Sequence, residues 1–481
     1  MNRKMISYTV GKITALEAIL LLLPAAVALY YRESCIFPIL ISAAVSAAVG
    51  GLLLLLSKPK DKTIYAKDGF MITALAWIIL SAIGALPFFI SGEIPNYIDA
   101  FFETVSGFTT TGASILTDVE KMSRGLLFWR SFTHWIGGMG VLVLMVALFP
   151  SDSGRSIHIL RAEMPGPIVG KLVPKAKNTA KILYLIYIVL TVLQMVILFT
   201  GGMPLFDSVV LSFGTAGTGG FGIRADSVAS YSPYLQNVIT VFMVLFGVNF
   251  NIFYLILIRR VKSVFKNTEL WCYLGLFAVA TALIAVNIYP MYNSVGDAVR
   301  LSAFQTASIM STTGYATANF DLWPGLSRSI ILLLMFIGAS AGSTAGGLKV
   351  SRVIMLLKTM RKDLKYRLHP KTVSVVRYEG KTLDKATARG VGSYFILYAV
   401  LFVIVFFILS FEPFSMETNI SAAASCINNV GPGLGSVGPA LSYAGYSWFS
   451  KIVLSLAMLF GRLELYPMLF LLTPTVWKKN S

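Results

Sequence analysis

Long apolar runs separated by short polar stretches form the main pattern of this chain. Five runs approach the roughly 20 residues with which an α-helix crosses a hydrocarbon core of about 30 Å; they are residues 13–31, 37–56, 182–199, 274–289 and 393–411. A soluble protein with a few buried helices would not contain so many of them. The pattern therefore predicts an all-α membrane protein that crosses the bilayer several times.

The first two runs predict a helical hairpin, and after it one pattern occurs four times. Each copy contains a spanning run, a semi-apolar stretch, a glycine-rich turn and a second spanning run. The semi-apolar stretches, at residues 99–109, 206–216, 299–311 and 416–428, are too short to cross the membrane but long enough to enter it halfway and return. We therefore predict four pseudo-symmetric helix–pore-half-helix–helix repeats around one pore, with turns centred on Gly112, Gly219, Gly314 and Gly431.

This pattern divides the chain into five segments. An N-terminal transmembrane hairpin (1–60) precedes pore repeats 1 (61–160), 2 (161–265) and 3 (266–365), and the last segment (366–481) holds a cytosolic basic loop and pore repeat 4. The hairpin and the repeats together give ten predicted spanning helices. The second spanning run of each repeat lies at residues 126–149, 234–258, 328–357 and 449–473.

Composition and charge favour the same interpretation and add an orientation. Hydrophobic residues make up 56% of the 481 residues and charged residues only 13%, against about 25% charged in soluble domains. The net charge of +18 does not indicate a nucleic-acid partner, because 31 of the 40 lysines and arginines fall in alternate gaps between apolar runs. Basic loops stay on the cytoplasmic side of a membrane. Both termini are therefore expected in the cytoplasm, with the glycine-rich turns entering from outside.

The residues of enzyme chemistry are scattered. Three cysteines (Cys35, Cys272 and Cys426) and three histidines lie far apart, without metal-ligand or CxxC spacing. A membrane-embedded transferase, the more remote alternative, would need clustered catalytic acids, histidines or a metal site. We expect neither an enzyme nor a cofactor.

Four glycine-rich turns around a shared axis would favour a cation. Each half-helix directs the negative end of its dipole toward the middle of the membrane, and the carbonyl oxygens that follow can replace the hydration shell of an ion. Glycine suits these turns because it adopts positive φ freely, although it can also simply ease helix packing. The threonine hydroxyls can add ligands or hold the loops by hydrogen bonds. The expected ion-binding filter comprises Thr110, Thr111, Gly112, Gly217, Thr218, Gly219, Thr312, Thr313, Gly314, Asn429, Val430 and Gly431.

The four turn segments resemble those of the Trk/Ktr/HKT potassium transporter superfamily, most closely its bacterial TrkH branch. They read DAFFETVSGFTTTGA (99–113), SFGTAGTGGFG (212–222), STTGYAT (311–317) and NNVGPGLGSVGP (428–439), in the order expected of that family. The resemblance covers nearly all of the chain. It implies a bacterial inner-membrane protein that takes up K⁺ bound at the filter glycines. It also implies a homodimer in membrane lipid and a cytosolic nucleotide-binding regulatory subunit (TrkA-like). Gly112 stands where serine accompanies sodium preference in plant relatives, so the resemblance favours potassium.

A run of small residues in repeat 3 predicts a gate. It interrupts the second span with residues of poor helix propensity, each glycine costing about 1 kcal/mol relative to alanine. These residues are Gly338, Ala339, Ser340, Ala341, Gly342, Ser343, Thr344, Ala345, Gly346 and Gly347. The resemblance implies a gating loop beneath the filter; a close-packed helix crossing is the alternative.

A charge at membrane depth must face the protein interior or a partner, and Arg462 lies in the middle of the last span. The family has an arginine just below the filter, so we expect a barrier to cations here; the alternative is an ion pair with Glu464. The predicted activity is channel-like potassium uptake. A sodium- or proton-coupled cation symporter of the same architecture is the alternative.

Five acidic residues close to the predicted half-helices allow two interpretations. They would concentrate cations at the mouth of a pore, or they would cap the half-helices at their N-termini. The sequence leaves both open for Asp99, Glu103, Asp207, Asp297 and Glu417.

Overall fold

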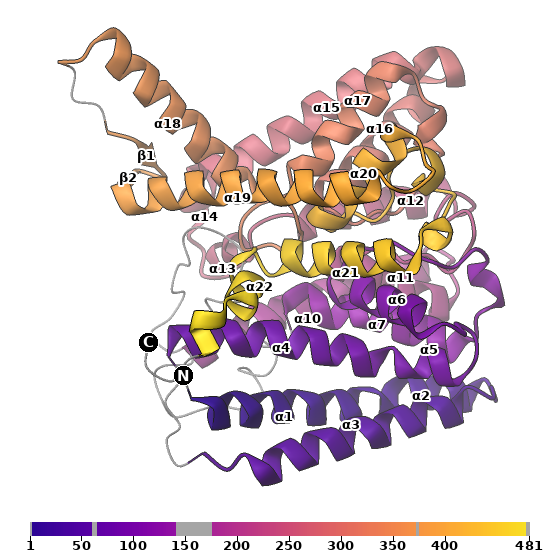
Figure 1. The fold of residues 1–481 in the computed structure, drawn as a ribbon. Helices are drawn as coiled ribbons and strands as arrows, with labels where there is room; N and C mark the ends of the chain where they lie inside the picture. The colour runs from indigo at the N-terminus through magenta and orange to yellow at the C-terminus, as the bar shows by residue number, and fades with distance from the viewer. Residues whose placement is uncertain (1, 60–64, 141–175, 372–374, 478–481) are drawn as a thin grey trace.

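The computed structural model describes residues 2–59, 65–140, 176–371 and 375–477, apart from some side chains within these ranges. Long helices lie side by side, and shorter helices are gathered between them (Figure 1). The N-terminal hairpin consists of α1 (Arg3–Leu20), α2 (Leu22–Tyr30) and α3 (Ile36–Leu56). Its helices approach closely through small residues, because a Cβ added at Gly50 would lie 2.7 Å from the backbone nitrogen of Ala15.

The first two repeats follow the hairpin. Repeat 1 contains α4 (Ala66–Gly84), α5 (Leu86–Ile90), the half-helix α6 (Tyr97–Phe108), the 3₁₀ turn η1 (Val119–Lys121) and α7 (Arg124–Met139). Repeat 2 contains α10 (Ala176–Thr200), the half-helix α11 (Leu205–Gly217), α12 (Pro233–Phe246), α13 (Phe250–Leu257) and α14 (Val261–Phe265).

The other two repeats share this order. Repeat 3 contains α15 (Thr268–Tyr292), the half-helix α16 (Val295–Met310), η2 (Phe320–Leu322), α17 (Gly325–Phe336) and α18 (Val350–Leu368). Repeat 4 contains α19 (Lys385–Leu409), the half-helix α20 (Met416–Asn428), η3 (Gly435–Val437), η4 (Tyr443–Gly445), α21 (Trp448–Arg462), α22 (Tyr466–Leu472) and η5 (Pro474–Trp477). A two-stranded antiparallel hairpin, β1 (Arg377–Tyr378) with β2 (Lys381–Thr382), lies between the two repeats and was not predicted.

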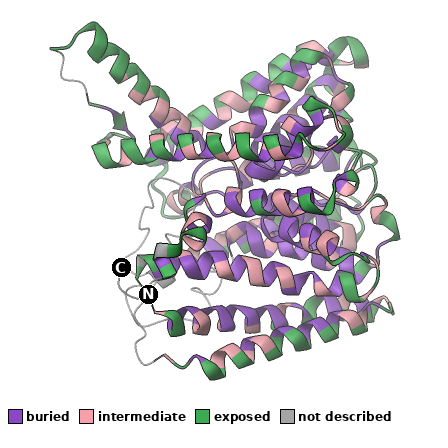
Figure 2. Cartoon of the chain, in the orientation of Figure 1, coloured by how far each residue is buried: buried purple, intermediate pink, exposed green. Residues whose placement is uncertain are grey.

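Within the described ranges, six helices are long and apolar enough to cross a membrane. They are residues 3–30 (α1 with α2), 36–56, 67–90 (α4 with α5), 178–200, 268–292 and 385–409. The bent pair of α12 and α13 is a seventh candidate. These helices expose leucines such as Leu52 and Leu55 of α3, 57% and 70% exposed, whereas the half-helices near the middle are largely buried (Figure 2). The observed architecture confirms the predicted all-α membrane fold.

The second span of repeat 2, predicted as one run at residues 234–258, folds as two helices. Helices α12 and α13 are bent by 90° at a break of a few residues. Gly247 follows the last residue of α12, and the side chain of Asn249 caps α13 by accepting a hydrogen bond from Asn251 N. An apolar run with one glycine and a cap inside it therefore folds as two helices.

The second span of repeat 3 is interrupted where the sequence predicted it, and that of repeat 4 is also divided. Residues 338–347 separate α17 from α18 without helix, as expected from their poor helix propensity. In repeat 4, Glu464 and Leu465 have φ of 57° and 68°, which separates α21 from α22. Residues 141–149 of the predicted span in repeat 1 lie outside the described residues.

The two described ends of the chain lie together. The guanidinium of Arg3 donates to the carbonyl oxygen of Trp477 over 2.7 Å. Helix α18 projects from the same end of the bundle (Figure 1).

Candidate functional site

The four half-helices end in the same backbone conformation. The residues that follow their last turns are Thr110, Thr218, Thr312 and Asn429, with φ of 55°, 55°, 56° and 55°. Few residues other than glycine adopt this left-handed region, and asparagine does so most readily. In all four turns the next N–H donates to a carbonyl of the half-helix, as Thr111 N does to Ser106 O over 2.9 Å. Because the same left-handed residue and the same hydrogen bond occur in every turn, the four turns can be aligned residue by residue in a common register.

That register differs from the predicted one in repeat 2. The glycines with positive φ at the equivalent position are Gly112 (81°), Gly220 (70°), Gly314 (85°) and Gly431 (105°). Gly219 therefore corresponds to Thr111, and the predicted Gly217 is the last residue of α11. Because residues 217–220 read Gly-Thr-Gly-Gly, the glycine pattern alone does not reveal which one occupies the turn.

The four turns contact one another in a closed ring. Each positive-φ glycine lies against a carbonyl oxygen of the next repeat, so closely that an added Cβ would clash with that oxygen. The contacts are Gly112 with Gly219, Gly220 with Thr313, Gly314 with Val430, and Gly431 with Thr111. The order runs from repeat 1 to repeat 4 and back to repeat 1, so the turns surround a single axis.

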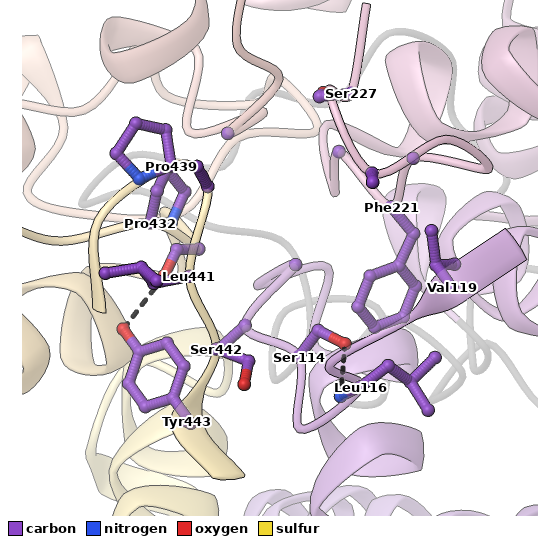
Figure 3. Close-up of a pocket in the computed structure, with 18 of the residues that line it drawn as sticks. Ser114, Leu116, Val119, Phe221, Ser227, Pro432, Pro439, Leu441, Ser442 and Tyr443 are labelled. Carbon is purple, nitrogen blue, oxygen red and sulfur yellow. Dashed lines mark hydrogen bonds between the residues drawn. The ribbon is translucent and has the colours of Figure 1, made fainter. Parts of the chain in front are cut away.

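The same four glycines line one cavity of about 230 Å³. Figure 3 shows its walls, formed by loop residues that follow the half-helices, including Ser114, Phe221 and Tyr443. The Tyr443 hydroxyl donates to the carbonyl oxygen of Gly431 over 2.9 Å. The cavity leads to the ring of turns from the side on which the half-helices begin.

Most of the polar side chains of the turns hold the loops together. The hydroxyls of Thr109 and Thr111 lie 2.8 Å apart, and those of Ser311 and Thr313 lie 2.6 Å apart. The Asn429 amide bridges two repeats, since Nδ2 donates to Thr111 Oγ1 over 3.0 Å and to the Met458 carbonyl over 2.9 Å. These bonds hold neighbouring turn residues and repeats together.

The small-residue run of repeat 3 is a loop packed beneath the ring. Gly346 N donates to Thr312 Oγ1 over 2.7 Å, and a Cβ at Gly346 would lie 2.5 Å from the carbonyl oxygen of Asn428. On the far side, the carboxylate of Glu269 accepts from Ala341 N over 2.7 Å and from Ser351 N over 3.1 Å. The loop is therefore bonded both to a turn of the ring and to α15.

Arg462 joins this loop to repeat 1. Its guanidinium donates to the carbonyl oxygens of Thr344 (2.7 Å), Gly137 (2.5 Å) and Gly138 (2.7 Å). Glu464, considered above as its ion-pair partner, instead binds Arg352 through two bonds of 3.0 and 2.5 Å. The structure thus places Arg462 against the small-residue loop of repeat 3.

The five acidic residues near the half-helices each lie close to a basic residue. Lys451 binds Asp99 over 2.7 Å, and Arg130 binds Glu103 over 2.6 Å. The remaining pairs are Arg224 with Asp207, Arg300 with Asp297, and Arg328 with Glu417. The side-chain caps of α6, α16 and α20 come from Asn96, Ser294 and Ser415. Four of the five acids are paired with a residue outside their own helix, whereas Asp297 and Arg300 both belong to α16.

The sequence did not single out Lys349 as a candidate functional residue. Lys349 is 1% exposed, and its ammonium group donates to the carbonyl oxygens of Ala345 and Gly346 in the loop. His134 lies behind the second turn, with Nδ1 donating to the Gly107 carbonyl over 2.8 Å. For Lys349 a signal existed, since it is a basic residue immediately after a run of small ones.

Apolar spanning helices with four re-entrant half-helices around one axis define a helical membrane transport protein. The model of the cation transport protein family TrkH matches residues 36–478, and the chain belongs to that family. It is 34% identical over 100% of both chains to the Trk system potassium uptake protein TrkH of Salmonella typhimurium. It is 32% identical, over 99% of both chains, to the Trk system potassium uptake protein TrkG of Escherichia coli.

A solved structure shares the fold. The crystal structure of the potassium transporter TrkH from Vibrio parahaemolyticus superposes with a TM-score of 0.88 at 32% sequence identity, covering 99% of this chain and 100% of that one. The relatives are named as uptake proteins and not as enzymes, in agreement with the expected class.

Proposed function

We propose that this protein takes up potassium through the ring of turns, in a channel-like manner. The observation that carries the proposal is the closed order of contacts in which each turn glycine lies against a carbonyl oxygen of the next repeat. Relatives that match this chain along nearly its full length are named as potassium uptake proteins, and these names support the choice of ion.

The filter chemistry follows from the backbone. Carbonyl oxygens of four turns replace the hydration shell of the ion, and the C-terminal ends of four half-helices favour positive charge near it. Glycine at positions 112, 220, 314 and 431 allows the approach that side chains would prevent. No covalent step is needed, since the membrane potential supplies about 2.3 kcal/mol per charge per 100 mV.

The loop at residues 338–347 is the gate of this proposal. Its contact with Thr312 and Asn428 places it against two of the four turns, on the side opposite the 230 Å³ cavity. Arg462, which holds the loop at Thr344, adds a positive charge that repels a cation leaving the filter. Opening then requires the loop to move away from these bonds.

Assembly and orientation complete the proposal. The chain forms a homodimer in a bacterial inner membrane and is regulated by a cytosolic nucleotide-binding subunit (TrkA-like), with both termini in the cytoplasm. Relatives named as parts of a Trk system in bacteria support this arrangement. The contact between Arg3 and Trp477 supports both ends lying on one side. The proposal also includes the division of the chain into five segments, with boundaries after residues 60, 160, 265 and 365.

Flux measurements in liposomes test the filter. Purified protein is reconstituted, and uptake of K⁺, Rb⁺, Na⁺ and Li⁺ is compared for the unaltered chain, Gly112→Ser and Gly220→Ser. We expect selective K⁺ and Rb⁺ flux that both variants reduce or make less selective. Gly275→Ser is the matched control, because a Cβ at Gly275 meets no heavy atom within 4 Å. Equal Na⁺ and K⁺ flux through the unaltered chain would refute potassium selectivity, and flux that requires a Na⁺ or H⁺ gradient would favour a coupled symporter.

A further inference from the structure

A second, larger cavity lies away from the ring of turns. It measures about 1440 Å³ and is enclosed by α2, the start of α7, the start of α11 and the loop after the second turn. These are the ends at which the half-helices begin, so the cavity is at the outer leaflet of the proposed orientation. It separates the N-terminal hairpin from repeat 2, and no part of the proposed transport path uses it.

The cavity walls are amphipathic along the membrane normal. Toward the middle of the bilayer they are apolar, with Leu23 and Val27 of α2 facing Phe128 of α7 and Val209 of α11. The rim carries the charged residues Arg124, Arg224, Glu33, Glu120, Lys121, Asp207 and Asp226. Leu23 is 49% exposed and Leu205 62% exposed, so apolar surface remains open to the bilayer.

Arg124 provides one cationic group at this rim that is not ion-paired. Its guanidinium carbon lies 4.4 Å from the centre of the Tyr31 ring and 5.7 Å from that of Phe206. Among the described residues no carboxylate forms an ion pair with it. The nearby carboxylate of Glu33 accepts instead from the backbone of Arg124 and Gly125, over 2.8 and 2.9 Å.

The other two cations of the rim differ from Arg124 in this respect. Lys121 binds Asp118 over 2.9 Å, and Arg224 lies 3.6 Å from Asp207. The guanidinium of Arg124, held between two aromatic rings, therefore stands free above an apolar cavity. Arginine matches phosphate geometry with two parallel hydrogen bonds.

We propose that this cavity binds one phospholipid of the outer leaflet. The phosphate diester lies on the Arg124 guanidinium, and an acyl chain follows the apolar wall between α2 and α11. A charged headgroup on an apolar chain satisfies both parts of the cavity, whereas a soluble anion would leave the apolar wall uncovered. Because the lipid contacts the hairpin, repeat 1 and repeat 2, it stabilises the packing of these three units.

Native mass spectrometry of the full-length protein in detergent tests the proposal. Phosphatidylethanolamine and phosphatidylglycerol are titrated against the unaltered chain, Arg124→Gln and Val27→Trp, which respectively remove the phosphate contact and fill the apolar cavity. We expect the tightest lipid adduct to weaken about ten-fold in each variant, as for loss of a charge-assisted bond pair. Lys121→Gln, at the same rim but already ion-paired, serves as the matched control and should retain the adduct.

Three outcomes would overturn the proposal. Unchanged lipid binding in both variants would mean that the tightest lipid sits elsewhere. If glycerol phosphate or inorganic phosphate displaced the lipid or protected the protein equally well, the site would belong to a soluble anion. If the variants altered the mass of the oligomer while lipid binding stayed constant, a second copy of the chain would occupy this face.

Discussion

Gly346 and Thr312 connect the loop of repeat 3 directly to the ring of turns. The backbone N–H of Gly346 donates to Thr312 Oγ1 over 2.7 Å, and Thr312 is the left-handed residue of its own turn. A movement of the loop must therefore break a hydrogen bond made by a turn residue. In the proposed mechanism, this bond couples the gate to the filter.

Gly346→Ala is expected to open the gate. The added methyl group would lie 2.5 Å from the Asn428 carbonyl oxygen, so the loop must withdraw. If about 1 kcal/mol of loop contact is lost, the open fraction rises about five-fold, and K⁺ flux in liposomes should rise with it. Gly325→Ala is the control, because nothing lies within 4 Å of a Cβ there. Reduced or unchanged flux through a folded Gly346→Ala protein would argue against the gate.

Lys349→Met should loosen the same loop from its other end. The ammonium group binds the carbonyls of Ala345 and Gly346 from a buried position, and methionine preserves the volume without the bonds. We expect a higher maximal K⁺ flux at unchanged ion selectivity, together with a loss of stability of about 1–3 kcal/mol from the unpaired carbonyls. Flux is measured in liposomes and stability by denaturant unfolding. A stability loss without a change in flux would assign Lys349 a structural role alone.

Arg462→Ala removes both the charge and three bonds to loop and helix carbonyls. We expect increased cation conductance, and Arg462→Gln should give a smaller increase because an amide keeps part of the bonding. Single-channel or liposome flux recordings distinguish the two variants. Conductance below that of the unaltered chain in both variants would contradict a barrier at this position.

The register of the second turn can be tested with His134. A Cβ at Gly219 would clash with the His134 ring, whereas one at Gly220 would clash with the Thr313 carbonyl. His134→Ala should therefore partly rescue K⁺ flux in Gly219→Ala but not in Gly220→Ala. A coupling energy of about 0.5–3 kcal/mol is typical of residues in contact, and a double-mutant cycle of thermal stability measures it. Equal rescue of both glycine variants would refute the assigned register.

The buried ion pair of Arg130 and Glu103 predicts a stability effect. Their side chains are 5% and 1% exposed and lie 2.6 Å apart, and Glu103 also accepts from Ser114 and Ile115 of the first turn's loop. Arg130→Met leaves a buried carboxylate unpaired and should cost about 3–5 kcal/mol. Thermal unfolding in detergent checks this, with Lys121→Met as a control because its pair with Asp118 is exposed. A similar loss in both variants would contradict the assignment.

The periodic pattern predicted the half-helices to within a few residues. The expected stretch at 416–428 coincides with α20, and the one at 206–216 differs from α11 by one residue at each end. Such short apolar stretches are bounded by turn residues, so their limits are local properties. The break in the second span of repeat 2 was not predicted, because hydrophobicity alone does not reveal that α12 ends before Gly247 and that Asn249 caps the next helix.

Contacts between distant residues could not be predicted from the pattern. The sequence suggested Glu464 as a partner for Arg462 because they are neighbours, but Arg352, far away in the chain, binds Glu464. Four of the five acids beside the half-helices were likewise paired by residues outside their own helix, as Asp99 is by Lys451. Choosing between Gly219 and Gly220 also required three-dimensional information, because the clash that distinguishes them involves repeat 3.

One chain supplies every turn of the ring, since the contact of Gly431 with Thr111 returns to the first repeat. Each conduction path is then formed by one subunit alone, in contrast to pores assembled from several chains. In a dimer with one inactivated copy, transport would fall to half and would not be abolished.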